Sequence, residues 1–206
     1  MLVTISGMVG SGKTTAAAHV SELLQQRGIE VESWRFQALP IFRRQPSPPT
    51  PAPSAEAERT AERWTGYKRK RLTARIALGQ VLRALAFRLY RRTRPSGRHQ
   101  VCSRYFYDSF VHYALGTRRE LLYAKLIRRC IPRPDLALLM VASADTIRSR
   151  RPRYSTAYLT QVWRAYDTLP RMFPELIPIS TDPDENAADA IEREILKWMH
   201  SNSFRA

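Results

Sequence analysis

Short runs of apolar or alternating residues recur along the chain, separated by longer segments whose apolar residues follow helical spacing. The short runs predict strands of a largely buried sheet, and they lie at 2–5, 29–36, 100–102, 136–141 and 176–180. The longer segments predict helices, and they lie at 15–27, 54–92, 108–115, 119–129, 143–151, 156–169 and from Asp182 onward. Strands and helices therefore alternate, which is typical of an α/β fold with a parallel sheet covered by helices on both faces.

A proline-rich segment interrupts this pattern after the second expected strand. Five prolines fall between Pro46 and Pro53, and neither a helix nor an inner strand accommodates such a run. We expect an exposed loop at about 41–55. No internal repeat and no clear linker divides the chain, so residues 1–206 are predicted to form one domain.

The most informative local pattern follows the first expected strand. Residues 7–14 read GMVGSGKT and fit the phosphate-binding pattern GxxxxGK[ST], in which glycines allow consecutive backbone N–H groups to face phosphate oxygens. Lys13 is placed to reach the β- and γ-phosphates, and the Thr14 hydroxyl is placed to bind Mg²⁺. The expected ATP contacts in this segment are Gly7, Gly10, Ser11, Gly12, Lys13, Thr14 and Thr15.

The charge is distributed unevenly along the chain. Lys and Arg number 34 against 18 Asp and Glu, a net charge of +16, and the segment 59–98 holds thirteen basic residues with Glu62 as its one acid. A basic face of this density suits polyphosphate, nucleic acid or an anionic membrane surface. Twenty-nine arginines against five lysines instead favour a compositional bias and a solvated surface, and both interpretations stay open.

Other sequence features indicate where in the cell the protein is expected. No apolar run approaches the length of a membrane span, and the N-terminus lacks the pattern of a signal peptide. Cys102 and Cys130 show no metal or disulfide spacing, so we expect free thiols and a cytoplasmic protein. A homodimer is left open.

Several of these motifs together resemble the thymidylate kinases and their uncharacterised relatives. The motifs are the segment 7–15, Ser103-Arg104-Tyr105 with Ser109, Arg133-Pro134-Asp135 before an apolar strand, the arginine cluster after residue 147, and Tyr166. The resemblance extends from Met1 to about Trp198. It implies the P-loop kinase fold, a three-layer α/β/α arrangement with a five-stranded parallel sheet. It also implies transfer of the γ-phosphate of Mg-ATP to a nucleoside monophosphate.

The resemblance assigns roles to particular residues of this chain. Arg104 and, from a lid at about 148–155, Arg148 and Arg151 are expected to be catalytic, with Arg150 and Arg153 in the same lid. Ser180 and Thr181 fall where the adenine of ATP binds. The expected acceptor contacts are Arg35, Phe36, Arg75, Tyr105 and Asp108.

The chain departs from the resembled family at three acidic positions. Ser6, Ser103 and Val141 stand where that family commonly has acids. A Mg²⁺ ion would therefore depend on Thr14, water and Asp108. The alternative role for Asp108 is the N-cap of the helix expected over 108–115.

Three functions remain open from the sequence. The first is a kinase acting on a small phosphorylated acceptor, with a nucleoside monophosphate favoured. The second is a kinase acting on a hydroxyl within nucleic acid, which the basic segment 59–98 would bind. The third is a degenerate nucleotide-binding module without turnover.

Overall fold

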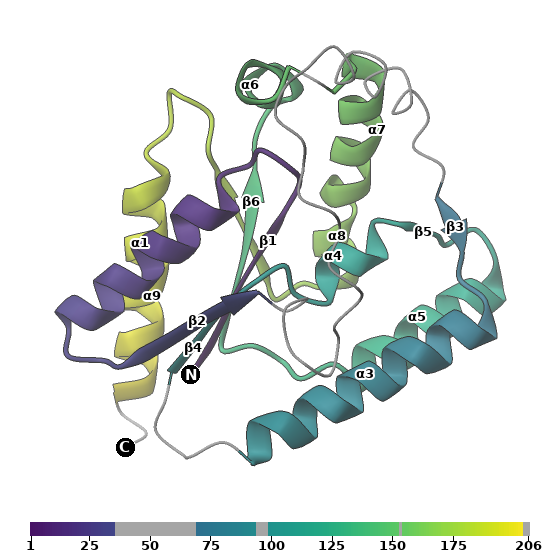
Figure 1. Cartoon of the computed structure of the whole chain (residues 1–206), viewed down its shortest axis with the longest axis horizontal. Helices are drawn as coiled ribbons and strands as arrows, with labels where there is room; N and C mark the ends of the chain where they lie inside the picture. The colour runs from purple at the N-terminus through teal and green to yellow at the C-terminus, as the bar shows by residue number, and fades with distance from the viewer. Residues whose placement is uncertain (36–68, 94–98, 153, 204–206) are drawn as a thin grey trace, which may run out of the picture.

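A sheet of five parallel strands forms the centre of the molecule (Figure 1). The computed structural model describes residues 1–35, 69–93, 99–152 and 154–203. The strands of the sheet are β1 (Leu2–Gly7), β2 (Val31–Arg35), β4 (His99–Ser103), β6 (Leu136–Val141) and β7 (Leu176–Ser180). Their spatial order is β2-β4-β1-β6-β7, so the five-stranded parallel sheet expected from the sequence is confirmed.

Helices cover both faces of this sheet. On one face lie α1 (Lys13–Gln26) and α9 (Ala187–Ser203). On the other lie α3 (Ala74–Arg92), α4 (Tyr107–Phe110), α5 (Arg118–Cys130), α7 (Thr156–Asp167) and α8 (Leu169–Met172). Successive side chains of β1 point to opposite faces of the sheet. Val3 and Ile5 pack in the core beneath α1 and α9, and Leu2 packs in the core on the opposite face. The expected three-layer arrangement is therefore confirmed.

The register of the central strands decides which loops meet. Ile5 of β1 lies opposite Ser103 of β4, and Gly7 lies opposite Met140 of β6. Arg35, the last residue of β2, is also paired with Ser103. Because parallel strands end at one edge of the sheet, the segments that follow β1, β4, β6 and β7 converge there, and α6 (Ala144–Arg150) stands at the same edge.

Several helix boundaries follow local signals. Thr117 caps α5 through a reciprocal bond with Glu120, and Ser143 caps α6 by accepting the N–H of Thr146. Expected and observed boundaries of α5 differ by one residue at each end, and β6 and β7 have the expected bounds.

The helix expected over 54–92 is confirmed over Ala74–Arg92, as α3, and is wrong over residues 69–73. Residues 54–68 lie outside the described residues, and Lys70–Arg71 form a short strand, β3, paired with β5 (Tyr113–Ala114). The hydroxyl of Thr73 accepts the N–H of Ile76 and so starts α3 at Ala74. An extended N-cap cannot lie inside a helix, so Lys70 and Arg71 precede α3 and are not part of it.

Two further helix predictions are wrong. The helix expected over 108–115 is the single turn α4, after which the chain is extended as β5. The last helix begins at Ala187, and not at Asp182. The Asp182 carboxylate instead accepts the N–H and the hydroxyl of Ser143, so it ties the segment after β7 to the start of α6.

Candidate phosphate-binding site

The segment between β1 and α1 is a tight loop whose path requires glycine. A Cβ added to Gly7, which has φ of 147°, would lie 2.4 Å from the carbonyl oxygen of Met140. Gly12 is the N-cap of α1 in the left-handed region, with φ of 77°. The loop can therefore follow the edge of β6 closely and present its N–H groups, together with those of the first turn of α1, to an anion.

Lys13 is buried, and its ammonium group is held by the loop itself. Its Nζ donates to the Met8 carbonyl oxygen over 2.5 Å, and the Ser11 hydroxyl donates to the same oxygen over 2.8 Å. Desolvation lowers the pKa of Lys13 to about 8, while the nearby Asp108 carboxylate raises it and Arg104 lowers it. A bound phosphate would bring further negative charge to this buried cation and would offset its desolvation.

Arg104 follows β4 in a left-handed conformation. Its φ is 63°, and no other non-glycine residue in the described part of the chain has a positive φ. Its N–H donates to the Ile5 carbonyl over 3.0 Å, so the backbone stays tied to β1 while the side chain remains exposed. Strained backbone of this kind is concentrated at functional positions.

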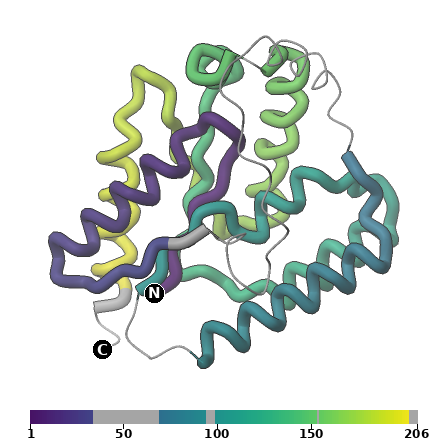
Figure 2. The backbone as a smooth tube through the Cα atoms, in the orientation of Figure 1, coloured from purple at the N-terminus to yellow at the C-terminus, as the bar shows by residue number. Residues whose placement is uncertain are grey.

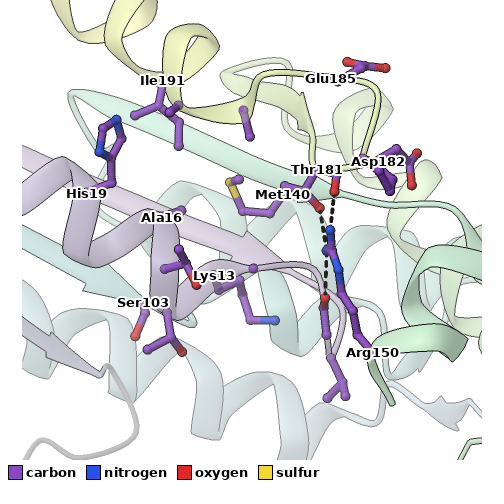
Figure 3. A pocket seen from close by; sticks show the side chains of 18 of the residues that line it. Lys13, Ala16, His19, Ser103, Met140, Arg150, Thr181, Asp182, Glu185 and Ile191 are labelled. Carbon is purple, nitrogen blue, oxygen red and sulfur yellow. Dashed lines mark hydrogen bonds between the residues drawn. The ribbon is translucent and has the colours of Figure 1, made fainter. Parts of the chain in front are cut away.

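Arg150 joins the phosphate-binding loop to the segment after β7 (Figure 3). Its Nη1 donates to the Gly10 carbonyl over 3.3 Å, and its Nη2 donates to the Thr181 carbonyl over 2.6 Å. Thr181 is buried, and its hydroxyl donates to the Val141 carbonyl over 3.2 Å. Three segments that are distant in sequence are thus fixed around one opening.

A cleft of about 780 Å³ opens between these segments. Eight of the residues expected to bind ATP or to act in catalysis line it, namely Gly10, Gly12, Lys13, Thr14, Thr15, Arg104, Arg151 and Thr181. Gly7 and Ser11 are buried behind this wall and shape the loop. Figure 3 shows Lys13, Ser103 and Arg150 among the side chains around the cleft.

Asp108 lies behind the phosphate-binding loop and is not part of the cleft wall. Its Oδ1 accepts the N–H of Gly7 over 3.2 Å and the hydroxyl of Tyr166 over 2.8 Å. Desolvation raises the pKa of Asp108, and Lys13 is the strongest influence in the opposite direction. The N-cap interpretation is wrong, because α4 is preceded by Phe106 and has no side-chain cap. The carboxylate holds the loop instead.

The other expected contacts are spread more widely. Arg148 donates from Nη1 to the Thr156 hydroxyl over 2.9 Å, outside the cleft wall. Arg75 is exposed in the first turn of α3. The backbone of Arg35 ends β2 at the edge where the cleft opens, but its side chain lies outside the described residues, as do Phe36 and Arg153. The proline-rich segment 41–55 also lies outside them.

Tyr105 does not fit the expected contact with an acceptor. Its side chain is 1% exposed, and its hydroxyl donates to the Pro132 carbonyl over 2.6 Å. The ring packs edge-on against Phe106 and Tyr107. An apolar pocket with an internal acceptor for the hydroxyl is the arrangement of a core tyrosine.

The sequence did not single out Arg150 within the arginine cluster, although a signal was present. Ile147 is fully buried in α6, and residues three and four positions later share its helical face. Those residues are Arg150 and Arg151, which both line the cleft, whereas Arg148 points elsewhere. The role of Tyr166 had no such signal, because its partner Asp108 is 58 residues away.

Comparison with known proteins identifies the fold. No protein-family model matches the chain, and no curated protein sequence matches it. The solved structures that are similar to this chain include two thymidylate kinases. The thymidylate kinase of Candida albicans has a TM-score of 0.57 at 14% identity, covering 98% of this chain and 92% of that chain. The thymidylate kinase of Ehrlichia chaffeensis has a TM-score of 0.51 at 18% identity, covering 97% and 98%. The chain therefore has a divergent thymidylate kinase-like fold, and the likeness at these identities concerns the fold alone.

The residues at the cleft fit a nucleoside triphosphate. The loop supplies N–H donors and Lys13, and Thr14 is exposed at the first turn of α1, where its hydroxyl is available to a metal ion. Within the described ranges, no group of three or more His, Cys, Asp and Glu side chains could hold a metal ion. A Mg²⁺ ion would therefore be held by Thr14, water and the phosphates.

Proposed function

We propose that this protein is a kinase that transfers the γ-phosphate of Mg-ATP to a small phosphorylated acceptor, with a nucleoside monophosphate favoured. One observation carries the proposal: a single cleft contains Lys13 of the phosphate-binding loop, Arg104 after β4 and Arg151 after α6. Phosphoryl transfer needs positioning and positive charge around the moving group, and these three residues supply both. The thymidylate kinase-like fold supports the same class of reaction.

Each residue has a distinct part in the proposed reaction. Lys13 exchanges the Met8 carbonyl for the β- and γ-phosphates. Thr14 would hold Mg²⁺, which would neutralise phosphate charge. Arg104 and Arg151 stabilise the charge on the transferring group. The bond from the γ-phosphorus to its bridging oxygen breaks, an acceptor oxygen takes its place, and ADP leaves.

The acceptor belongs at the ends of β2 and β4. Arg35 and Ser103 are paired there, one residue before Arg104, and an arginine at that point suits an acceptor phosphate. Phe36 follows directly and is proposed to contact the rest of the acceptor. Arg75 is a further proposed contact.

A screen with γ-labelled ATP tests the proposal. Nucleoside monophosphates, nucleosides, sugars and oligonucleotides are offered in parallel, and we expect label transfer to at least one nucleoside monophosphate. Lys13→Ala should reduce turnover at least about 100-fold, because a contact to the transferring phosphoryl group is lost. Activity of Lys13→Ala close to that of the unaltered protein would refute the assignment, and transfer to oligonucleotides alone would favour the nucleic-acid kinase.

A specific observation also supports the module without turnover. Asp108 faces the back of the loop, while Ser6 and Ser103 supply no carboxylate to the cleft. Such a module would bind ATP, seen as a rise in melting temperature, and would transfer no label to any acceptor.

A further inference from the structure

The cleft at the phosphate-binding loop has two unlike ends. One end is formed by the loop itself, and Lys13 lies there. At the other end the wall is apolar and consists mostly of small side chains, namely Ala16 of α1 with Ala187, Ala188 and Ile191 of α9. A nucleotide is divided in the same way, into a charged phosphate chain and a flat base. The apolar end therefore suits the base of a nucleotide whose phosphates meet the loop.

His19 of α1 brings a polar atom to the apolar end. It lies six residues after Lys13, which is about 9 Å along the helix axis, and Figure 3 shows it on the side of Ile191 and away from Arg150. Its ring nitrogen Nε2 is buried and has no hydrogen-bond partner among the residues that the structure describes. Buried polar atoms in folded proteins nearly always have a partner. A buried nitrogen on the wall of a cleft therefore indicates that a ligand supplies the bond.

The packing of α1 against α9 holds His19 in place. The two helices lie side by side (Figure 2). Val20 of α1 and Ile191 of α9 are buried in the same core. Further along α1, Arg27 donates from Nη2 to the Glu192 carboxylate over 2.8 Å. The half-buried imidazole is therefore fixed between two helices that are joined both by apolar contacts and by an ion pair.

The position of the ring proton determines which ligand group His19 can bind. Buried N–H donors without a partner are rarer in proteins than buried acceptors without one. We therefore assign the proton to Nδ1 and treat Nε2 as an acceptor. An acceptor at this point needs a donor on the base. Adenine carries a donor at its edge, the 6-amino group, whereas guanine carries a 6-oxo group at the same position.

We propose that Nε2 of His19 accepts a hydrogen bond from the 6-amino group of the adenine of ATP, and that this contact selects ATP over GTP as the phosphate donor. The base lies between α1 and the start of α9, where Ala16 and Ala187 leave room for its flat ring. This inference rests on the proposed function, because it concerns the nucleotide that supplies the phosphoryl group. His19 touches the base and none of the reacting atoms, so it acts on the choice of nucleotide.

Titration calorimetry with four ligands tests the proposal. The full chain with Mg²⁺ is titrated with ATP, with GTP, with purine riboside triphosphate, which lacks the 6-amino group, and with inorganic tripolyphosphate, which lacks the base. The unaltered protein should bind ATP about fivefold more tightly than purine riboside triphosphate, because one neutral hydrogen bond is lost. GTP should bind more weakly still, because its 6-oxo group would face an acceptor.

Substitutions of His19 assign the preference to the ring nitrogen. His19→Phe keeps a flat ring without Nε2 and should bind ATP about fivefold more weakly, with ATP and purine riboside triphosphate bound equally. Its affinity for tripolyphosphate should be unchanged, because the phosphate-binding loop is intact. His19→Gln, whose side-chain oxygen can accept the bond, should recover part of the preference for ATP. His200→Phe alters an exposed position of α9 and serves as the control, which should bind all four ligands as the unaltered protein does.

Three results would overturn the proposal. One is equal affinity of the unaltered protein for ATP and purine riboside triphosphate, a comparison that depends on no substitution. Another is a His19→Phe variant that binds ATP as tightly as the unaltered protein. The third is an equal loss of affinity for ATP and tripolyphosphate in His19→Phe, which would place the effect in the loop. Label transfer is measured separately, so selective ATP binding without transfer would contradict the proposed kinase and still support the contact at His19.

Discussion

Lys13 is predicted to destabilise the folded protein when no nucleotide is bound. Its ammonium group is buried, and desolvation, the largest influence, lowers the pKa of Lys13 from 10.5 to about 8. That difference corresponds to about 3 kcal/mol in favour of the neutral side chain. Methionine has a similar length and no charge, so Lys13→Met removes this cost. It also removes the hydrogen bond to the Met8 carbonyl, which contributes about 1 kcal/mol.

The net expectation is that Lys13→Met is more stable than the unaltered protein by about 2 kcal/mol at pH 7. For a chain of this size the gain corresponds to a rise in melting temperature of about 4–8 °C. The same variant should lose ATP binding, because the cation that meets the phosphates is gone. Added ATP should therefore raise the melting temperature of the unaltered protein alone.

The pH dependence gives a second readout. The pKa of Lys13 is lower in the folded chain than in the unfolded chain, so between about pH 8 and pH 10.5 the unfolded chain binds more protons. Stability of the unaltered protein should rise with pH across this window, and the advantage of Lys13→Met should shrink accordingly. Urea unfolding at pH 7, 8, 9 and 10 measures the stability of the unaltered protein and the difference between it and Lys13→Met. Lys197→Met, which alters an exposed lysine, serves as the control.

The reasoning would be refuted by a Lys13→Met variant that is no more stable at pH 7. It would equally be refuted by a stability gain that stays constant from pH 7 to pH 10. Either result would mean that the ammonium group is well solvated in the apo protein.

Three further substitutions test the site. Gly7→Ala should lower the free energy of unfolding by more than about 3 kcal/mol, because its Cβ would meet backbone at 2.4 Å; Gly116→Ala, which has nothing within 4 Å, is the control in urea unfolding. Asp108→Asn should reduce turnover at least about tenfold with little change in melting temperature. The amide oxygen can still accept the hydrogen bonds from Gly7 and Tyr166, but the negative charge beside the loop is lost. Unchanged turnover would mean that the carboxylate has a structural role only. Arg150→Gln should weaken ATP binding about tenfold in titration calorimetry, because it breaks the link between the phosphate-binding loop and the segment after β7. The control Arg148→Gln should change the logarithm of the affinity by less than half as much. Equal effects of the two substitutions would contradict the arrangement around the cleft.

Features of the protein whose signals are local can be predicted from its sequence. The GMVGSGKT segment specifies its loop, because glycine spacing and the lysine that follows are sufficient for a phosphate-binding turn. The apolar run at Leu136–Val141 fixed β6 with its observed bounds, since only a strand inside the sheet buries such a run on both faces. The caps at Thr117 and Ser143 likewise involve partners three residues away.

Helix predictions failed where a local pattern competed with a distant partner. The apolar spacing around Arg71 predicts a helix, but this segment forms β3 and pairs with β5, which lies more than forty residues further along the chain. Asp182 has the residue type of an N-cap, yet its carboxylate bonds to Ser143 at a separation of 39 residues. Contacts of this length depend on the packed fold and leave no periodic trace in the sequence.

The contacts that support the site depend on the packed fold and could not be predicted from the sequence. The Asp108 carboxylate reaches Gly7 across 101 residues of chain, and only the register of β1 against β4 brings the two together. The left-handed backbone of Arg104 and the burial of Tyr105 in the core are likewise features of the packed fold. The sequence supplied the residues that meet a phosphate, and the alignment of the strands decided which side chains hold them in place.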